Sequence, residues 1–247
     1  MFGVLYVAIG ESYIKEACLS LKSLRSKMPL VKSAIFCDQK DSLPRDFFDY
    51  TEEIELPAYS FLDRIKCLLK SPFSETLYLD SDTTIIKPLD ELNVILENVD
   101  LAVTQAPWRL SENKKPDLLN QAFPEPSAGV ILYRKTKEVE DLFKDWLDIY
   151  RNNYGESSGF RNDQGAFRKA LIDSGIKFWV LPCEYNLRII YPYFAGGSAS
   201  VKIIHGRSPY LKKIIRQINK RLVPRIGKPL IIQSLYKKII RRAKRLN

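Results

Sequence analysis

Two aspartates one residue apart interrupt an otherwise apolar segment, "ETLYLDSDTTII", at residues 75–86. Carboxylates with the spacing of Asp80 and Asp82 can both reach one divalent cation if the chain turns there. Mg²⁺ and Mn²⁺ usually take one or two protein carboxylates and keep their other positions for water and phosphate oxygens. The pair therefore favours a metal that carries a diphosphate, and two solvated aspartates in a turn are the alternative.

The single histidine of the chain, His205, closes the apolar run "VKII" and precedes Gly206. Imidazole is a good ligand for Mn²⁺ beside carboxylates, and a glycine lets the backbone approach a phosphate. A lone histidine is more often a packed or surface residue than a ligand. Its role as a metal ligand therefore depends on His205 lying at the same sheet edge as Asp80 and Asp82.

Alternating strands and helices are predicted to position these side chains. The predicted strands span residues 2–9, 33–38, 52–56, 75–80, 100–105, 126–134, 177–182 and 199–206. The predicted helices span residues 12–24, where Ser12 is the expected cap, and 59–70, 88–98, 136–153 and 162–175, the last capped by Asn162. This order predicts an α/β fold with a mostly parallel, doubly wound sheet that binds ligands at the carboxyl ends of its strands.

Charge divides the chain into two predicted parts. The net charge is +10, yet residues 207–247 hold fourteen Lys and Arg and no Asp or Glu. Residues 1–206 hold twenty-five basic and twenty-nine acidic side chains, a net charge of −4. We therefore expect a mildly acidic body and a basic tail, which differs from a uniformly basic nucleic-acid binder.

The body, residues 1–206, contains a series of motifs in a fixed order. They read "YVAIGESYIKEACLSLKSLR", "RIKCLLKSPFSETLYLDSDTTIIKPLDEL", "SAGVILYR", "NDQGAF" and "IIHG". In this order and at these intervals they resemble nucleotide-diphospho-sugar glycosyltransferases of the GT-A fold, and among them glycosyltransferase family 8, the glycogenin and lipopolysaccharide galactosyltransferase group. The resemblance implies a hexosyltransferase that uses Mn²⁺ or Mg²⁺ and moves a sugar from a nucleotide-diphosphate donor to a glycan, glycolipid or protein acceptor.

The same resemblance implies a role for each matching position. Asp80, Asp82 and His205 match the protein ligands of the metal. The positions that match the donor-binding residues are Ala8, Ile9, Gly10, Tyr13, Arg64, Ser81 and Gly129, with Ser127 and Ala128 beside the donor sugar. Asp163 and Gln164 match the motif next to the anomeric centre and are the implied catalytic pair.

Glycosyl transfer gives these assignments a chemical reason. Negative charge builds on the departing diphosphate, where a cation and Arg64 would stabilise it, and positive charge builds at the anomeric carbon, on the side of Asp163 and Gln164. An ordinary helix N-terminus is the alternative for Asp163. The chain departs from the family in "HGRSPYLKK", where a Lys-Pro-Trp signature is common. Arg207 then either replaces the phosphate contact of that lysine or leaves it absent.

A second enzyme class shares part of the central motif. The segment "LYLDSDTT" also matches the Asp-x-Asp-x-Thr opening of haloacid-dehalogenase-like phosphatases, in which the first aspartate is a nucleophile. In those proteins the motif usually closes the first strand, and a later strand ends in a second acidic pair. Here three predicted strands precede Asp80 and no later predicted strand ends in such a pair, which disfavours the phosphatase.

The tail is predicted to form two basic amphipathic helices, at residues 208–223 and 230–247. Apolar residues at helical spacing opposite Lys and Arg are typical of helices that lie on an anionic membrane surface. The alternatives are packing on the body or on a second subunit, or a non-enzymatic role in nucleic-acid binding, which the absence of stacking aromatic residues disfavours. Because the first residues lack the features of a signal peptide, we expect a cytoplasmic protein, peripheral on the inner face of a membrane.

Overall fold

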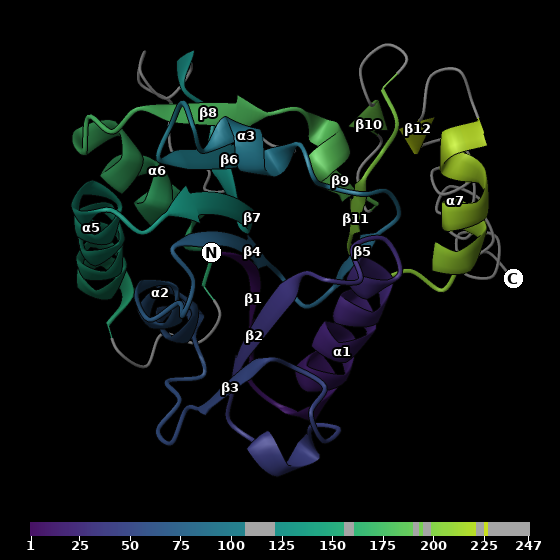
Figure 1. The fold of residues 1–247 in the computed structure, drawn as a ribbon. Coiled ribbons are helices and arrows are strands. Elements are labelled where there is room, and N and C mark those ends of the chain that lie inside the picture. The colour runs from purple at the N-terminus through teal and green to yellow at the C-terminus, as the bar shows by residue number, and fades with distance from the viewer. Residues whose placement is uncertain (107–121, 156–160, 190–192, 195–198, 221–224, 227–247) are drawn as a thin grey trace, which may run out of the picture.

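The computed structural model describes residues 1–106, 122–155, 161–189, 193–194, 199–220 and 225–226 (Figure 1). Its centre is a seven-stranded sheet in the order β3-β2-β1-β4-β7-β6-β8. These strands are β1 (Phe2–Ala8), β2 (Lys32–Cys37), β3 (Tyr50–Glu53), β4 (Glu75–Leu79), β6 (Leu101–Gln105), β7 (Pro126–Arg134) and β8 (Phe178–Leu181). The predicted α/β fold with a mostly parallel sheet is confirmed.

One strand of the sheet runs against the others. β7 pairs antiparallel with β4 and with β6, whereas β1 pairs parallel with β2 and β4. The first residues of β7 therefore lie at the edge where β1 and β4 end. This reversal brings Gly129 beside the aspartate pair, since the amide N–H of Asp80 donates to the carbonyl of Gly129 over 2.9 Å.

Helices cover both faces of the sheet, as Figure 1 shows. α1 (Glu11–Arg25) lies on one face, and α2 (Phe61–Leu69), α5 (Lys137–Tyr154) and α6 (Gln164–Asp173) lie on the other. The alternation of side chains along β1 explains its continuous apolar sequence. Val4 and Tyr6 belong to the core under α1, while Leu5 belongs to the core under α2, α5 and α6.

The turn between β1 and α1 depends on a glycine. Gly10 has a φ of 94°, and its N–H donates to Oδ1 of Asp38 over 2.8 Å at the end of β2. A residue with a Cβ rarely adopts that backbone. α1 begins at Glu11, directly after Gly10, so the prediction that Ser12 caps this helix was wrong.

Two other predicted helices differ from the structure at their ends. α6 begins at Gln164 after Asp163, although Oδ1 of Asn162 does accept a hydrogen bond from the N–H of Gln164. Of the helix predicted at residues 88–98, the segment Leu92–Ile95 is α-helical and forms α3.

A smaller sheet stands beside the central one, in the order β5-β11-β9. It consists of β5 (Thr83–Ile85), β11 (Ile203–His205) and β9 (Leu187–Arg188). β11 pairs antiparallel with β5, with His205 opposite Thr83. Because β5 begins at Thr83, the residue directly after Asp82, this register places His205 next to Asp82.

The first part of the tail packs on this small sheet. α7 (Leu211–Gln217) and the following turn η3 (Ile218–Lys220) cover part of the helix predicted at residues 208–223. Leu211, Ile214 and Ile215 contact an apolar cluster that contains Ile204 and Ile218. In this part of the tail the apolar stripe therefore packs on the body, which was the alternative to a membrane surface. The second predicted tail helix, at residues 230–247, lies outside the described residues.

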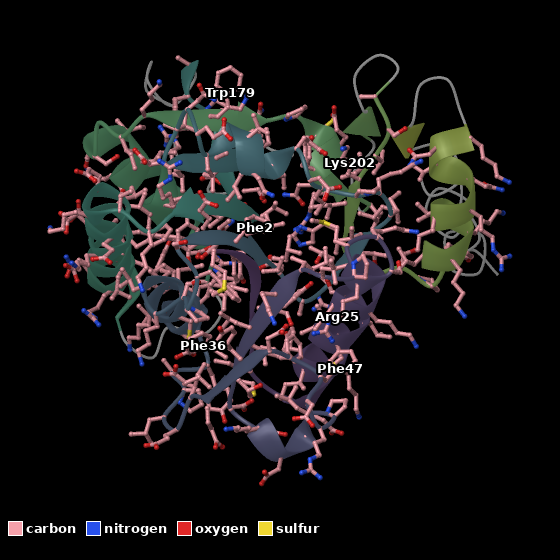
Figure 2. The ribbon with its side chains drawn as sticks, viewed as in Figure 1. Phe2, Arg25, Phe36, Phe47, Trp179 and Lys202 are labelled. Atoms are coloured by element: carbon pink, nitrogen blue, oxygen red, sulfur yellow. The ribbon has the colours of Figure 1, made fainter. Side chains whose placement is uncertain are left out.

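The remaining elements are short. The turn η1 (Lys40–Ser42) precedes β3, the turn η2 (Cys183–Tyr185) precedes β9, and β10 (Tyr193–Phe194) pairs with β12 (Arg225–Ile226). At the C-terminal end of α1, the Arg25 guanidinium lies 5.7 Å from the ring centroid of Phe47, and both residues are labelled in Figure 2. Among the described residues, no helix combines the length and apolar character that crossing a membrane would need.

Candidate active site

Three potential metal ligands meet where β4 ends. One ligand atom from each of Asp80, Asp82 and His205 lies within 4.8 Å of the others. Nε2 of His205 is 3.1 Å from Oδ1 of Asp82 and 3.5 Å from Oδ2 of Asp80. The backbone holds this arrangement, because the N–H of Gly206 donates to the carbonyl of Asp82 over 3.0 Å.

Gly129 makes room for the three ligands. A Cβ at this position would collide with Cε1 of His205 and would lie 2.6 Å from Oδ2 of Asp80. Real Cβ atoms do not approach other atoms so closely, so only glycine fits between these two ligands without displacing them. Gly129 therefore serves the site by having no side chain.

The carboxylate of Asp82 is held in its charged form. Burial opposes its ionisation, but the charges of Arg207 and Arg188 favour it, and the pKa of Asp82 is lowered. Nη1 of Arg207 lies 3.4 Å from Oδ2 of Asp82. An ionised, partly buried carboxylate beside an imidazole is suited to bind a cation.

Arg64 contacts both the potential metal ligand Asp80 and Asp163 of the predicted catalytic pair. Its Nη1 donates to Oδ1 of Asp80 over 3.2 Å, and its Nη2 makes a short contact with Oδ2 of Asp163. The guanidinium lies 4.4 Å from the ring centroid of Phe61, and Tyr78 donates to Oδ1 of Asp80 over 2.7 Å. Arg64 is thus fixed by two carboxylates and an aromatic face.

Burial and neighbouring charges have opposing effects on the pKa values of Asp163 and Arg64. Burial raises the pKa of Asp163, and the charge of Arg64 counteracts part of that rise. Burial alone would lower the pKa of Arg64, but the charges of Asp163, Tyr78 and Asp80 outweigh it and raise that pKa. The buried guanidinium therefore remains a fixed positive charge next to the potential metal ligand Asp80.

Two cavities open on these residues and share a boundary. The first has a volume of about 260 Å³ and the second about 270 Å³. Phe61, Arg64, Asp80 and Arg188 line both cavities. Among the residues predicted from the sequence, Ile9, Tyr13, Ser81, Asp82 and His205 line the first cavity, whereas Ser127, Ala128, Gly129, Asp163 and Gln164 line the second.

The two remaining predicted positions, Ala8 and Gly10, contribute backbone near the cavities and no side chain to their lining. Ala8 is fully buried at the end of β1 and contributes no side chain to the lining of either cavity. Gly10 shapes the turn that follows and places Ile9 and Tyr13 at the first cavity. The structure thus gathers the predicted residues at one edge of the sheet, with these two in supporting positions.

Several residues of the site were not predicted. Arg188 lines both cavities, and Asn186 contacts the ring of His205. Glu16 accepts hydrogen bonds from Nη2 of Arg207 over 2.6 Å and from the hydroxyl of Ser81 over 3.1 Å. Arg188 could have been proposed from the sequence, because it is a charged residue inside the apolar run "NLRII". Nothing in the local sequence distinguishes Glu16 or Asn186 from ordinary surface residues.

The arginines leave hydrogen-bond donors beside the cavities. Among the described residues, Nε of Arg64 and Nε of Arg188 are buried and have no hydrogen-bond partner. Buried donors are nearly always paired in folded proteins, so an unpaired one indicates a missing acceptor. Arg207, which lines the first cavity, adds a third positive charge. The arrangement suits an anionic ligand that reaches from one cavity to the other.

Comparison with known proteins identifies the fold. No family model matches the chain, and no curated protein matches it. A solved structure of an active-site mutant of LgtC matches with a TM-score of 0.59 and 15% sequence identity, covering 85% of this chain and 88% of that one. The galactosyltransferase LgtC in complex with donor and acceptor sugar analogues matches with a TM-score of 0.57, the same identity and the same coverage. The chain therefore has the GT-A fold of LgtC.

Proposed function

We propose that this protein is a metal-dependent glycosyltransferase that uses a nucleotide-diphosphate sugar as its donor. The observation that carries the proposal is the meeting of Asp80, Asp82 and His205 at the boundary of two cavities lined by arginines. The GT-A fold agrees with it. At 15% identity the fold by itself leaves the activity open, so the chemistry of the site has to support it.

The residues present fit a divalent cation. Two carboxylates and an imidazole form a mixed oxygen and nitrogen set that suits Mn²⁺, or Mg²⁺ when water completes the shell. Gly129 leaves the space between the ligands free of side-chain atoms. When bound, the cation would neutralise the charge that develops on the departing diphosphate.

The chain itself would supply the other parts of donor recognition. Ile9 and Tyr13 lie where the nucleobase and ribose would enter the first cavity, with Ser81 nearby. Arg64 and Arg188 stand at the boundary, where their guanidinium groups would stabilise the diphosphate. The sugar would then occupy the second cavity against Ser127, Ala128 and Gly129, where the side chains are small.

Asp163 and Gln164 are proposed as the catalytic pair on the sugar side. Both line the second cavity, and Asp163 is 2% exposed. The ion pair with Arg64 holds Asp163 as a buried negative charge, which would stabilise positive charge at the anomeric carbon. The amide of Gln164 can orient sugar hydroxyls. The acceptor, a glycan, a glycolipid or a protein, would approach this cavity from its open side.

The phosphatase alternative gains no support from the fold. Asp80 follows β4, the fourth strand along the chain, and β7 next to it runs antiparallel.

A screen for the donor tests the proposal directly. Nucleotide diphosphates and nucleotide sugars should raise the melting temperature in the presence of Mn²⁺, and the matching sugar donor should be hydrolysed slowly or transferred. Asp82→Ala and His205→Ala should abolish this turnover. Metal-dependent turnover of phosphomonoesters, with no response to any nucleotide sugar, would overturn the assignment.

For the tail we propose attraction to an anionic membrane surface, with residues 1–206 as the transferase domain and residues 207–247 as the tail. The exposed side of α7 carries Lys212, Lys213 and Arg216. Each such charge near an anionic surface contributes on the order of 1 kcal/mol. This contact would bring the cavities to an acceptor on the membrane.

Flotation with vesicles tests this role of α7. Changing Lys212, Lys213 and Arg216 together to Glu should reduce the binding of the full chain to vesicles that contain anionic lipid. The control changes exposed Lys22, Lys27 and Lys40 to Glu, which alters the net charge equally but away from α7. Equal loss in both triple variants would point to overall charge, and retention by nucleic acid but not by vesicles would point to a different partner.

A further inference from the structure

We propose that Asn186 is a positioning residue that keeps the proton of the His205 ring on Nδ1, so that Nε2 is left to face Asp80 and Asp82. The inference rests on the metal site of the proposed function. It concerns a side chain that belongs to neither the aspartate pair nor the catalytic pair. Asn186 lies between η2 and β9, and its side chain is fixed inside the protein.

The contact between the two side chains is short and buried. Oδ1 of Asn186 lies 2.7 Å from Nδ1 of His205. The exposed fractions of Asn186 and His205 are 3% and 1%, so water does not compete for this contact. An amide oxygen only accepts hydrogen bonds, so a proton must sit on Nδ1 for the bond to form.

Two hydroxyl groups hold the amide of Asn186 in place. Its Nδ2 lies 2.8 Å from the hydroxyl of Thr104 on β6 and 2.8 Å from the hydroxyl of Ser127 on β7. A hydroxyl can donate or accept, so these contacts fit either orientation of the amide. The choice between the orientations depends on the other side of the His205 ring.

Arg188 decides the orientation at that other side. Its Nη1 lies 2.6 Å from Nε2 of His205 and 3.2 Å from Nδ1, and a guanidinium has donors but no acceptor. A proton on Nε2 could form a hydrogen bond with Oδ1 of Asp82, which is 3.1 Å away. The same proton would, however, point two donors at each other, because the N–H group of Arg188 is closer. A lone pair on Nε2 satisfies the closer of the two Arg188 contacts, while Nδ1 has its nearest partner in Oδ1 of Asn186. This assigns the ring proton to Nδ1 and the amide oxygen of Asn186 to the position beside it.

This assignment has a consequence for metal binding. A histidine ligand binds a metal through a lone pair, and the partner of its other nitrogen selects which nitrogen has it. With Nδ1 occupied by Asn186, Nε2 is the nitrogen that lies next to both carboxylates. The buried chain from Thr104 and Ser127 through Asn186 thus prepares His205 for the cation before it arrives.

Because His205 is the only histidine of the chain, its ring can be observed without assignment. Long-range ¹H–¹⁵N spectra of the metal-free wild-type protein, recorded at mildly alkaline pH where an imidazole is ordinarily neutral, report which nitrogen has the proton. We expect a protonated Nδ1. A ring with its single proton on Nε2 would overturn the proposal. This measurement needs neither a variant nor an active enzyme, so it is independent of the proposed transferase activity.

Variants of Asn186 test the effect on metal binding. Asn186→Leu keeps the approximate size but removes the acceptor, and should weaken Mn²⁺ binding by about 10- to 100-fold, the usual effect of losing such a partner. It should also shift the proton toward Nε2. Asn186→Asp keeps an acceptor for Nδ1–H and should bind Mn²⁺ within a few-fold of wild type. Binding is measured by the paramagnetic resonance signal of free Mn²⁺.

Asn219→Leu is the matched control, because Asn219 also bridges buried groups but at the backbone of Val201, away from the ring. It should leave both the spectrum and Mn²⁺ binding unchanged. Wild-type Mn²⁺ affinity in Asn186→Leu would refute the role of Asn186. Loss of affinity in Asn186→Asp as well as in Asn186→Leu would show that the amide donates to the ring, which would also refute it.

Discussion

At the scale of single residues, Gly129 shows how an absent side chain can shape a site. We expect Gly129→Ala to separate His205 from Asp80, because the new Cβ would overlap both ligands. Mn²⁺ affinity should fall at least tenfold, and metal-dependent donor turnover should fall with it. Titration with Mn²⁺ followed by paramagnetic resonance measures the first effect, and hydrolysis of the donor measures the second.

Gly165→Ala is the matched control for that substitution. At Gly165, in the first turn of α6, the nearest atom to a new Cβ would be Oε1 of Glu125 at 3.6 Å, an ordinary contact. Alanine also favours a helix over glycine by up to about 1 kcal/mol. This variant should therefore bind Mn²⁺ normally and be at least as stable as wild type. Equal Mn²⁺ affinity in the two variants would contradict our account of Gly129.

Arg64 is a second residue whose removal should have a defined effect. Arg64→Leu leaves the buried carboxylate of Asp163 without its partner, and breaking a buried ion pair in this way costs about 3–5 kcal/mol. Urea unfolding should show that loss. Adding Asp163→Asn removes the unpaired charge, so the double variant should regain part of the lost stability. If the double variant loses as much free energy of unfolding as the two single variants lose together, Arg64 and Asp163 do not stabilise each other.

At the scale of elements, the start of α2 both stabilises a helix and shapes a cavity. The carboxylate of Asp63 accepts hydrogen bonds from the N–H groups of Ala58 and Ser60, while the hydroxyl of Ser60 accepts from the N–H of Leu62. Ser60 and Asp63 also line the first cavity. The capping box therefore fixes the backbone that carries Arg64 into the site.

Asp63→Ala should lower the free energy of unfolding by about 1–2 kcal/mol, since it leaves two backbone donors without their acceptor. Urea denaturation measures this change. Asp145→Ala, which removes an exposed aspartate from α5, is the control and should change the stability by about 0.5 kcal/mol or less. A similar small effect at Asp63 would show that the capping box contributes little to the fold.

The elements also show how far the sequence could predict this structure. Long apolar or periodic segments, such as those of β1, β4 and α5, were predicted because their burial follows directly from their pattern. β5 and β9 were missed because strands of three and two residues are too short for a pattern. The direction of β7 was also not predicted, because apolar alternation is the same in both directions.

The residues of the candidate site also fall into those that the sequence could predict and those that it could not. The residues at the ends of long strands, Asp80 and His205 among them, could be proposed because strand ends converge at one edge. Asn186 and Glu16 depend on contacts between segments far apart in the chain, which no local pattern records. Likewise, the apolar stripe of α7 could be predicted from its spacing, but its packing on the small sheet rather than on a membrane could be identified only from the fold.

At the scale of the whole molecule, the three proposed metal ligands connect the central sheet to the small one. Asp80 and Asp82 lead from β4 to β5, and His205 ends β11, on which α7 packs through the shared apolar cluster. A cation bound by all three residues would bind the folded chain and not the unfolded one. Metal binding should therefore stabilise the whole protein.

Mn²⁺ at about 100 times its dissociation constant should add about 2.7 kcal/mol to the free energy of unfolding. For a chain of this size that corresponds to a rise of about 5–10 °C in Tm, and a chelator should reverse it. Asp82→Asn should lose the rise because the site loses a charged ligand, whereas Asp173→Asn, at the distant end of α6, should keep it. Since the stabilisation comes from ligands on both sheets, His205→Ala should lose the rise as well. A full Mn²⁺ response in either ligand variant would mean that the cation binds elsewhere on the molecule.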